Sequence, residues 1–139
     1  MEKIVTKDGS VTFRRDDIGE SYHTTSGAEE EAVKKYIEPS LERLKVKGKL
    51  RILDVCFGLG YNTAAALDKL DDVEVVALEN DPEILSKINE VESSFESYDK
   101  IRKASSDLSY EDNKVKIRIV LGDAIETVKK LEGEFDLIF

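Results

Sequence analysis

The chain has 139 residues, of which 40% are hydrophobic and 37% charged, and its formal net charge is −9. This length predicts a single domain with enough apolar residues for a buried core. The acidic balance argues against a chain that alone holds a phosphate backbone, because lysine and arginine carry most nucleic-acid affinity. One cysteine rules out an intrachain disulfide, and zinc-ligand spacing, a signal-like segment and an apolar span of about 18 residues are all missing, so a soluble cytoplasmic protein is expected.

Residues 1–49 are expected to form a β-hairpin, a loop and a helix. Lys3–Thr6 and Val11–Arg15 flank Asp8-Gly9, a dipeptide that tight hairpin turns favour. After a polar loop, a helical pattern places five apolar residues on one face, and Pro39 is expected to kink or break that helix. These five residues are Ala32, Tyr36, Ile37, Leu41 and Leu44.

The most informative segment is 51–63, an apolar run that ends in an acid and a glycine-punctuated turn. It predicts a buried parallel strand, a ligand-binding loop and a helix that begins near Tyr61. Gly58 and Gly60 allow positive φ angles and close approach of a ligand to the backbone, and the first amides of the helix point into the same crevice. We therefore expect a ligand that contains adenosine.

The residues around these glycines favour S-adenosylmethionine (SAM) over a dinucleotide, which stays the alternative. The dinucleotide fingerprint has a third glycine three residues after Gly60, where this chain has Thr63. Instead, Asp54 closes the strand, and the loop resembles the acid-x-Gly-x-Gly-x-Gly loop of class I SAM methyltransferases, with Cys56 in place of the first glycine. A carboxylate suits the ammonium and sulfonium groups of SAM better than it suits a pyrophosphate.

A second apolar run, Val73–Leu78, ends in Glu79 and Asn80, both candidate cofactor-binding residues. Glu79 follows Asp54 by 25 residues and is placed to accept hydrogen bonds from both ribose hydroxyls. The alternative for Glu79 alone is a solvated loop acid. Asp81-Pro82 predicts the N-cap and first residue of the next helix.

A third strand, Val115–Leu121, leads into Gly122-Asp123-Ala124. Because this loop opens at the same sheet edge, Asp123 can accept the adenine amino group while the Ala124 N–H faces a ring nitrogen. The alternative for Asp123 is the N-cap of a helix over residues 125–131.

The alternation of strands and helices from residue 50 onward predicts an α/β doubly wound sheet with right-handed crossovers. Phe135–Phe139 is the fourth predicted strand, left as an unpaired edge. One long helical stretch is expected to pack in the core through Ile84, Ile88, Val91, Phe95 and Tyr98. We therefore expect one structural domain, in which residues 50–139 form an incomplete cofactor-binding core.

The chain resembles the MnmC-like methyltransferase family over about residues 9–139. Ser21-Tyr22-His23, the segment 27–32 and the segment 54–63 carry the likeness, and Glu79 matches the family's acidic second-strand end. The family's phenylalanine-glycine-x-glycine-x-asparagine core is matched by Phe57, Gly58, Gly60 and Asn62. Methyltransferase domains of this family place the final methyl group on 5-aminomethyl-2-thiouridine at the tRNA wobble position.

The resemblance implies a Rossmann-like class I SAM methyltransferase sheet that is truncated after the fourth strand, with SAM as cofactor and tRNA as substrate of the complete enzyme. It also suggests that Tyr22 and His23 close over the methionine end or the acceptor, although a lone loop histidine is typical of packing. The family's acceptor-pocket segment follows the fourth strand, so no catalytic residue is assigned here. Asp136, near the start of that strand, is predicted to be structural.

Two other readings stay open. An aminopropyltransferase of the spermidine synthase type would have a related fold, but it usually shows three consecutive glycines, which this loop lacks. A SAM-binding module without turnover is the second alternative, because half of the sheet and the acceptor pocket are not expected within the chain. A partner chain or a second copy would then complete the sheet.

Overall fold

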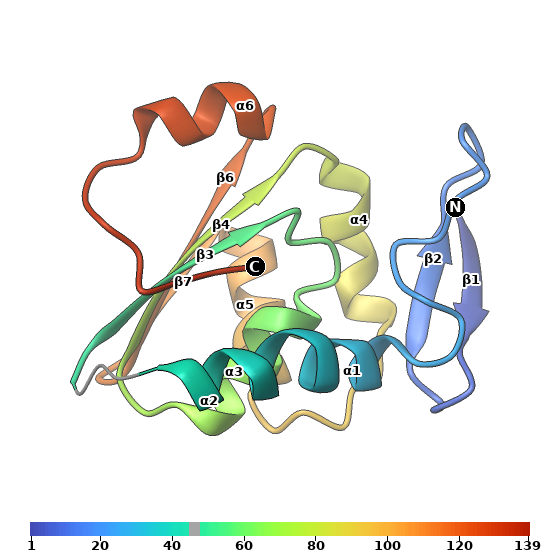
Figure 1. Ribbon diagram of the computed structural model, residues 1–139. Helices are drawn as coiled ribbons and strands as arrows, with labels where there is room; N and C mark the ends of the chain where they lie inside the picture. Colours follow the sequence, from blue (N-terminus) through green and yellow to red (C-terminus); the bar gives the residue numbers. More distant parts are fainter. Residues whose placement is uncertain (45–47) are drawn as a thin grey trace.

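The computed structural model describes residues 1–44 and 48–139, which form a two-stranded hairpin and a five-stranded sheet with helices (Figure 1). The strands are β1 (Glu2–Val5), β2 (Val11–Arg14), β3 (Leu50–Val55), β4 (Val73–Glu79), β5 (Ser109–Glu111), β6 (Val115–Leu121) and β7 (Leu137–Ile138). The α-helices are α1 (Ala28–Glu31), α2 (Glu38–Arg43), α3 (Tyr61–Lys69), α4 (Pro82–Lys87), α5 (Tyr98–Asp107) and α6 (Ala124–Thr127). A π-helical segment, Ala32–Ile37, joins α1 to α2, and 3-10 turns extend α4 over Ile88–Glu90 and α6 over Val128–Lys130.

The strand order in the sheet is β5-β6-β4-β3-β7, and only β5 runs antiparallel to its neighbour. Val55 on β3 pairs with Leu78 on β4, and Leu78 pairs with Val120 on β6, so the carboxyl ends of the three strands lie at one edge. The predicted Rossmann-like α/β sheet is therefore confirmed, and it brings together the loops that follow β3, β4 and β6.

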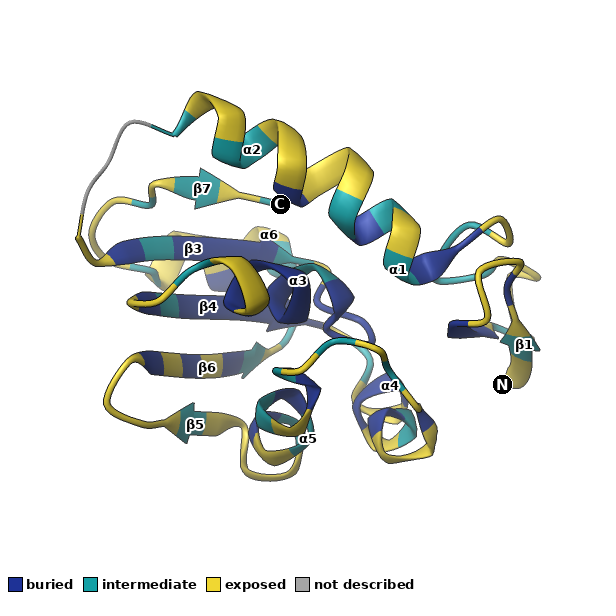
Figure 2. Ribbon diagram, turned by 90° about the horizontal axis from the view of Figure 1, so that it is seen from below, coloured by how far each residue is buried: buried dark blue, intermediate teal, exposed yellow. Residues whose placement is uncertain are grey.

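The two faces of the sheet are covered unequally (Figures 1 and 2). Helices α3 and α5 lie over one face, where Val75, Ile117 and Ile119 belong to the main core, and α1 and α4 contribute buried residues to the same core. A small cluster of Leu53, Val76 and Leu78 lies on the other face and is covered by α6 and the segment after it. The structure thus has helices on both sides of the sheet, as a doubly wound fold requires, but most of the apolar packing is on one side.

The N-terminal hairpin is confirmed, with β1 and β2 antiparallel and Gly9 at a φ of 85° in the turn. The helical region differs from its prediction at two points. Pro39 lies in the first turn of α2 after the π-helical segment, so the helix continues through a change of hydrogen bonding and is not broken. Tyr36 is 37% exposed, whereas Ala32 and Ile37 are buried.

Two further predictions were wrong in their extent, and one strand was missed. The long helical stretch is two helices, because the chain between Ile88–Glu90 and α5 leaves the helical conformation, although Ile88, Val91 and Tyr98 are buried. The predicted fourth strand, 135–139, is reduced to Leu137–Ile138, and its neighbour Asp136 accepts the Arg51 N–H, which is a structural role. The antiparallel strand β5 was not predicted.

Candidate functional site

A cavity of about 330 Å³ opens where the carboxyl ends of the strands face the loop between β2 and α1. The sheet side is lined by Cys56, Leu78, Glu79, Asn80, Gly122 and Ala124. The opposite side is lined by Arg15, Ile18, Glu20, Ser21 and Tyr22. The volume lies within the range of small-molecule sites, and a mixture of apolar walls with few polar groups is typical of them.

The glycine loop adopts the left-handed conformation that the sequence predicts. Gly58 and Gly60 have φ angles of 57° and 74°. A Cβ atom on Gly60 would lie 2.6 Å from Ile101 Cγ2 and 2.8 Å from Phe57 Cζ, so the space beside this glycine is filled by the protein itself. Gly60 and the buried Phe57 therefore serve the packing of the loop, and neither lines the cavity.

Glu79 lies at the centre of the site and is only 4% exposed, so it is not a solvated loop acid. Its Oε2 accepts the Gly58 N–H at 2.7 Å, and its Oε1 accepts the N–H groups of Asn80 and Asp81, each at 2.9 Å. A carboxylate has about four acceptor positions, so these three bonds leave one for a ligand. Asp81 in turn is the N-cap of α4, accepting from Glu83 N, with Pro82 in the first turn as predicted.

Asp54 is 1% exposed and lies behind the glycine loop, outside the cavity lining. Its Oδ2 accepts the Thr63 hydroxyl at 2.6 Å, so the residue that replaces the third glycine binds the acid directly. Its Oδ1 is buried and has no hydrogen-bond partner within residues 1–44 and 48–139. Burial raises the pKa of Asp54 to about 7; the hydrogen bond from Thr63 acts in the opposite direction, and the nearby Glu79 carboxylate adds to the rise.

The β6–α6 loop contributes Gly122 and Ala124 to the cavity. Asp123 is exposed and outside the lining; its Oδ1 accepts the Ile125 N–H at 2.8 Å, so it acts as the N-cap of α6. Asn62, in the first turn of α3, is half-buried and also lies outside the lining. The adenine role of Asp123 stays a prediction.

Tyr22 and His23 take different positions. Tyr22 lines the cavity, and its hydroxyl donates to Asp81 Oδ2 at 2.7 Å. Burial and this hydrogen bond raise the pKa of Tyr22, so the phenol stays protonated. His23 lies outside the lining, with its ring edge against Tyr61 and its Nδ1 3.0 Å from Thr12 Oγ1. Burial lowers the pKa of His23 to about 4, as expected of a neutral packing histidine.

Seven residues that line the cavity were not among the predicted site residues: Arg15, Ile18, Glu20, Ser21, Cys56, Leu78 and Gly122. Cys56, Leu78 and Gly122 directly neighbour predicted residues. In the N-terminal group, Ser21 directly precedes the predicted Tyr22, and the other three could be suspected only from Ile18, a single large apolar residue in a polar stretch. Within the described ranges, no group of three histidine, cysteine or acidic side chains could hold a metal ion, and no helix has the length and apolar character to cross a membrane.

Comparison with solved structures finds MnmC2 from Aquifex aeolicus, with a TM-score of 0.75 and 33% sequence identity over 99% of this chain. The chain resembles the N-terminal part of an MnmC-like methyltransferase. The MnmC-like resemblance drawn from the glycine loop is thus confirmed. Spermidine synthase from Thermotoga maritima shares the fold with this MnmC-like chain at a TM-score of 0.54 and 20% identity. The fold is therefore of the SAM-dependent methyltransferase type.

Two proteins of Methanocaldococcus jannaschii are also similar to the MnmC-like chain. The uncharacterized protein MJ0670 is 27% identical over 98% of the chain, and the uncharacterized protein MJ1233 is 31% identical over 70% of it. The chain spans 40% and 28% of these relatives and 47% of the MnmC2 structure. No protein-family model matches it.

Proposed function

We propose that this MnmC-like chain binds SAM in the cavity at the carboxyl edge of the sheet and supplies the cofactor-binding part of a methyltransferase. The observation that carries the proposal is Glu79, a buried carboxylate that lines the cavity and holds the glycine loop through Gly58. Glu79 is the last residue of β4, and its carboxylate has about one acceptor position left after its three hydrogen bonds. This position suits a ribose hydroxyl as the donor.

The residues of the chain fit SAM better than a dinucleotide. Two buried carboxylates, Asp54 and Glu79, lie behind and beside the glycine loop, and the Oδ1 atom of Asp54 has no partner in the described part of the chain. The Glu79 carboxylate, which lines the cavity, favours a ligand with ammonium and sulfonium groups and disfavours a pyrophosphate. Gly58 and Asn80 would lie beside the ribose, and Ala124 beside the adenine.

When bound, SAM supplies a methyl group that its sulfonium already activates. The residues described here bind and orient the ligand, and positioning is the main requirement for such a displacement. Tyr22 stays protonated and donates a hydrogen bond to Asp81, so its role is to position the loop between β4 and α4. No residue within the described ranges is assigned as catalytic.

For the complete enzyme we propose an amine on a modified tRNA wobble uridine, 5-aminomethyl-2-thiouridine, as the methyl acceptor. The similarity to MnmC2 at 33% identity supports this substrate class. The net charge of −9 supports an RNA-binding surface outside this part of the protein. An aminopropyltransferase is the weaker candidate, because spermidine synthase is similar in fold alone and the loop lacks three consecutive glycines.

Isothermal titration calorimetry with SAM tests the proposal. We expect saturable binding by the wild-type chain and at least a tenfold loss of affinity in Glu79→Gln, which keeps the side-chain shape but cannot accept a hydrogen bond at both ends. Asp71→Asn, at an exposed acid far from the cavity, is the control and should bind as the wild type does. A folded wild-type chain that binds NAD and not SAM would overturn the proposal. Equal affinity for decarboxylated SAM would favour an aminopropyltransferase.

A further inference from the structure

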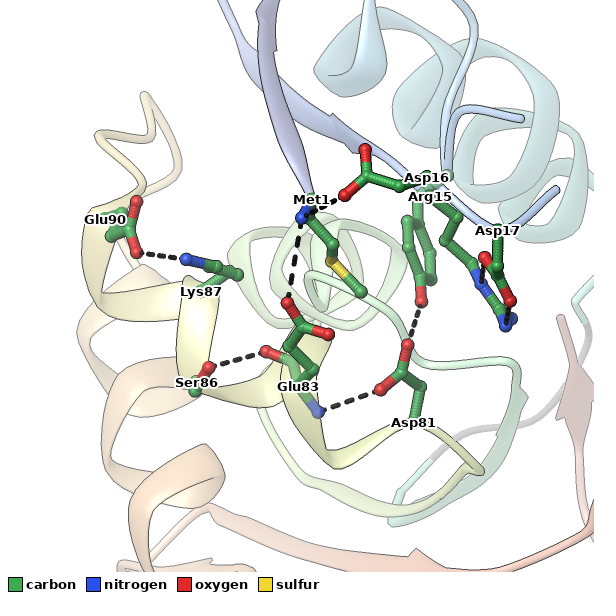
Figure 3. Close-up of polar contacts among 10 residues, drawn as sticks. Met1, Arg15, Asp16, Asp17, Asp81, Glu83, Ser86, Lys87 and Glu90 are labelled. Carbon is green, nitrogen blue, oxygen red and sulfur yellow. Dashed lines mark hydrogen bonds and ion pairs between the residues drawn. The ribbon is translucent and has the colours of Figure 1, made fainter. Parts of the chain in front are cut away.

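The loop that follows β2 forms a distinct part of the site, and we call residues 15–22 the wall segment. Five of its residues line the cavity opposite the strand ends. The segment is folded into a tight turn, because Arg15 N donates to Glu20 O and Gly19 N donates to Arg15 O, both at 2.8 Å. The Arg15–Asp17 ion pair at 2.6 Å closes the same turn (Figure 3). The wall segment therefore has a defined shape.

Hydrogen bonds connect the wall segment to the glycine loop. Tyr22 donates to Asp81, Asp81 N donates to Glu79, and Glu79 accepts Gly58 N, at 2.7, 2.9 and 2.7 Å in that order. Figure 3 shows Asp81 at the start of α4, where it also accepts the Glu83 N–H. The Tyr22 ring also lies 3.6 Å from the position that a Cβ atom on Gly58 would take. The wall is thus fixed to the same acid that we assign to the ribose.

Ile18 is the unusual residue of the wall segment. It lines the cavity and is 56% exposed, so more than half of this large apolar residue faces solvent in the free chain. The lining also includes the apolar side chains of Leu78, on β4, and Ala124, at the start of α6, close to the groups that we assign to the adenosine. A flat apolar ring between these two sides would remove Ile18 from water, which is favourable in proportion to the apolar area covered.

We propose that the wall segment closes the cofactor site and that Ile18 is a cofactor-contacting residue, packing on the adenosine part of SAM from the side opposite the strands. This inference rests on the proposed function and adds to it a contact that the glycine loop does not supply. It also explains why a polar, exposed turn carries one large aliphatic side chain.

The test is Ile18→Ala, with Val5→Ala as the matched control. Both positions expose a branched aliphatic side chain in the N-terminal region, at 56% and 67%, but Val5 does not line the cavity. We expect Ile18→Ala to leave the thermal unfolding midpoint of the free chain unchanged and to weaken SAM binding about tenfold in calorimetry. The control should change neither quantity.

Limited trypsin digestion gives an independent readout, because Arg14 directly precedes the wall segment and Arg15 is its first residue. SAM should slow cleavage after these two residues in the wild-type chain, and should slow it less in Ile18→Ala at the same SAM concentration. If the wild type binds SAM but Ile18→Ala binds equally well, or if SAM does not protect these bonds, the wall inference is wrong and the proposed function stands. If the wild type does not bind SAM, the proposed function itself fails.

Discussion

Cys56 is a non-glycine residue in the left-handed region, with a φ of 63°, at the position where the class I loop has its first glycine. This conformation costs a residue with a Cβ atom about 1–2 kcal/mol. Glycine avoids that cost, but it loses more conformational entropy on folding, which offsets part of the gain. We expect Cys56→Gly to raise the free energy of unfolding by about 0.5–1 kcal/mol, measured by urea denaturation.

Cys56→Ala is the control, because alanine keeps the strain. Its stability should equal that of the wild type or fall slightly below it. Both variants remove the thiol group, but only glycine relieves the backbone strain. Equal changes in stability would therefore come from loss of the thiol and would contradict the prediction.

Asp54 makes stability depend on pH, because its pKa of about 7 in the folded chain is above the ordinary value of 3.8. The folded state therefore binds the proton more tightly, and stability falls as pH rises from about 4 to about 7. Asparagine does not titrate, so Asp54→Asn removes this loss. The free energy of unfolding of the variant, relative to that of the wild type, should therefore rise by about 1–4 kcal/mol between pH 5.5 and pH 8.

Urea denaturation at several pH values measures this gain. Asp71→Asn, whose exposed carboxylate has no hydrogen bond or ion pair in the described part of the chain, should follow the wild type at every pH. Parallel curves for Asp54→Asn and the wild type would show that Asp54 is ionised in both states.

At the level of elements, Asp8 joins the hairpin to α1. Its Oδ1 accepts from Ser10 N at 2.9 Å and its Oδ2 accepts from Glu30 N at 2.9 Å. Although burial acts in the opposite direction, hydrogen bonds from Ser10, Thr6 and Glu30 lower the pKa of Asp8 to about 2. This contribution to stability is present above about pH 4 and is lost as pH falls through about 2.

Asp8→Asn should destabilise the chain by about 1 kcal/mol at neutral pH. The amide nitrogen replaces one of the two carboxylate oxygens and cannot accept a hydrogen bond, so the bond to either Ser10 N or Glu30 N is lost. Denaturation at pH 7 and at pH 2.5 measures the difference, which should shrink at the lower pH. An unchanged difference at pH 2.5 would contradict a role for the ionised carboxylate.

The parallel strands could be predicted from local patterns, whereas the break between α4 and α5 could not. Residues 84–98 have a helical apolar period, but Ser93 and Ser94 donate to the Glu29 carboxylate, and the N–H groups of Glu96 and Ser97 are accepted by Asp68. These acceptors come from distant parts of the sequence, so tertiary contacts override the local period. Strand β5 has no apolar alternation of its own and forms by pairing with β6.

The site shows the same division. Glu79, Asn80 and Ala124 follow strand ends and could be predicted because parallel strands present their carboxyl ends at one edge. Tyr22 was predicted from the family resemblance, but the rest of the wall segment could not be, because its approach to this edge depends on where the hairpin packs. The Tyr22–Asp81 hydrogen bond that holds it joins residues 59 positions apart.

At the scale of the whole molecule, the sheet has one well-covered face and two edge strands, β5 and β7. β7 pairs with β3 on one side, and within the described ranges no strand pairs with its other side. Ile138 on this edge is 66% exposed. An exposed apolar edge strand offers unpaired backbone groups to another chain, and natural sheets block such edges with charge, often lysine.

We therefore expect the chain to self-associate as its concentration rises, and we expect Ile138→Lys to reduce this association at least severalfold in sedimentation velocity experiments. Ile125→Lys is the matched control, because Ile125 is 69% exposed but lies on α6, away from a strand edge, so its variant should associate like the wild type. Circular dichroism checks that both variants keep the fold. A wild-type chain that stays monomeric at all concentrations, or equal behaviour of the two variants, would show that the β7 edge does not mediate association.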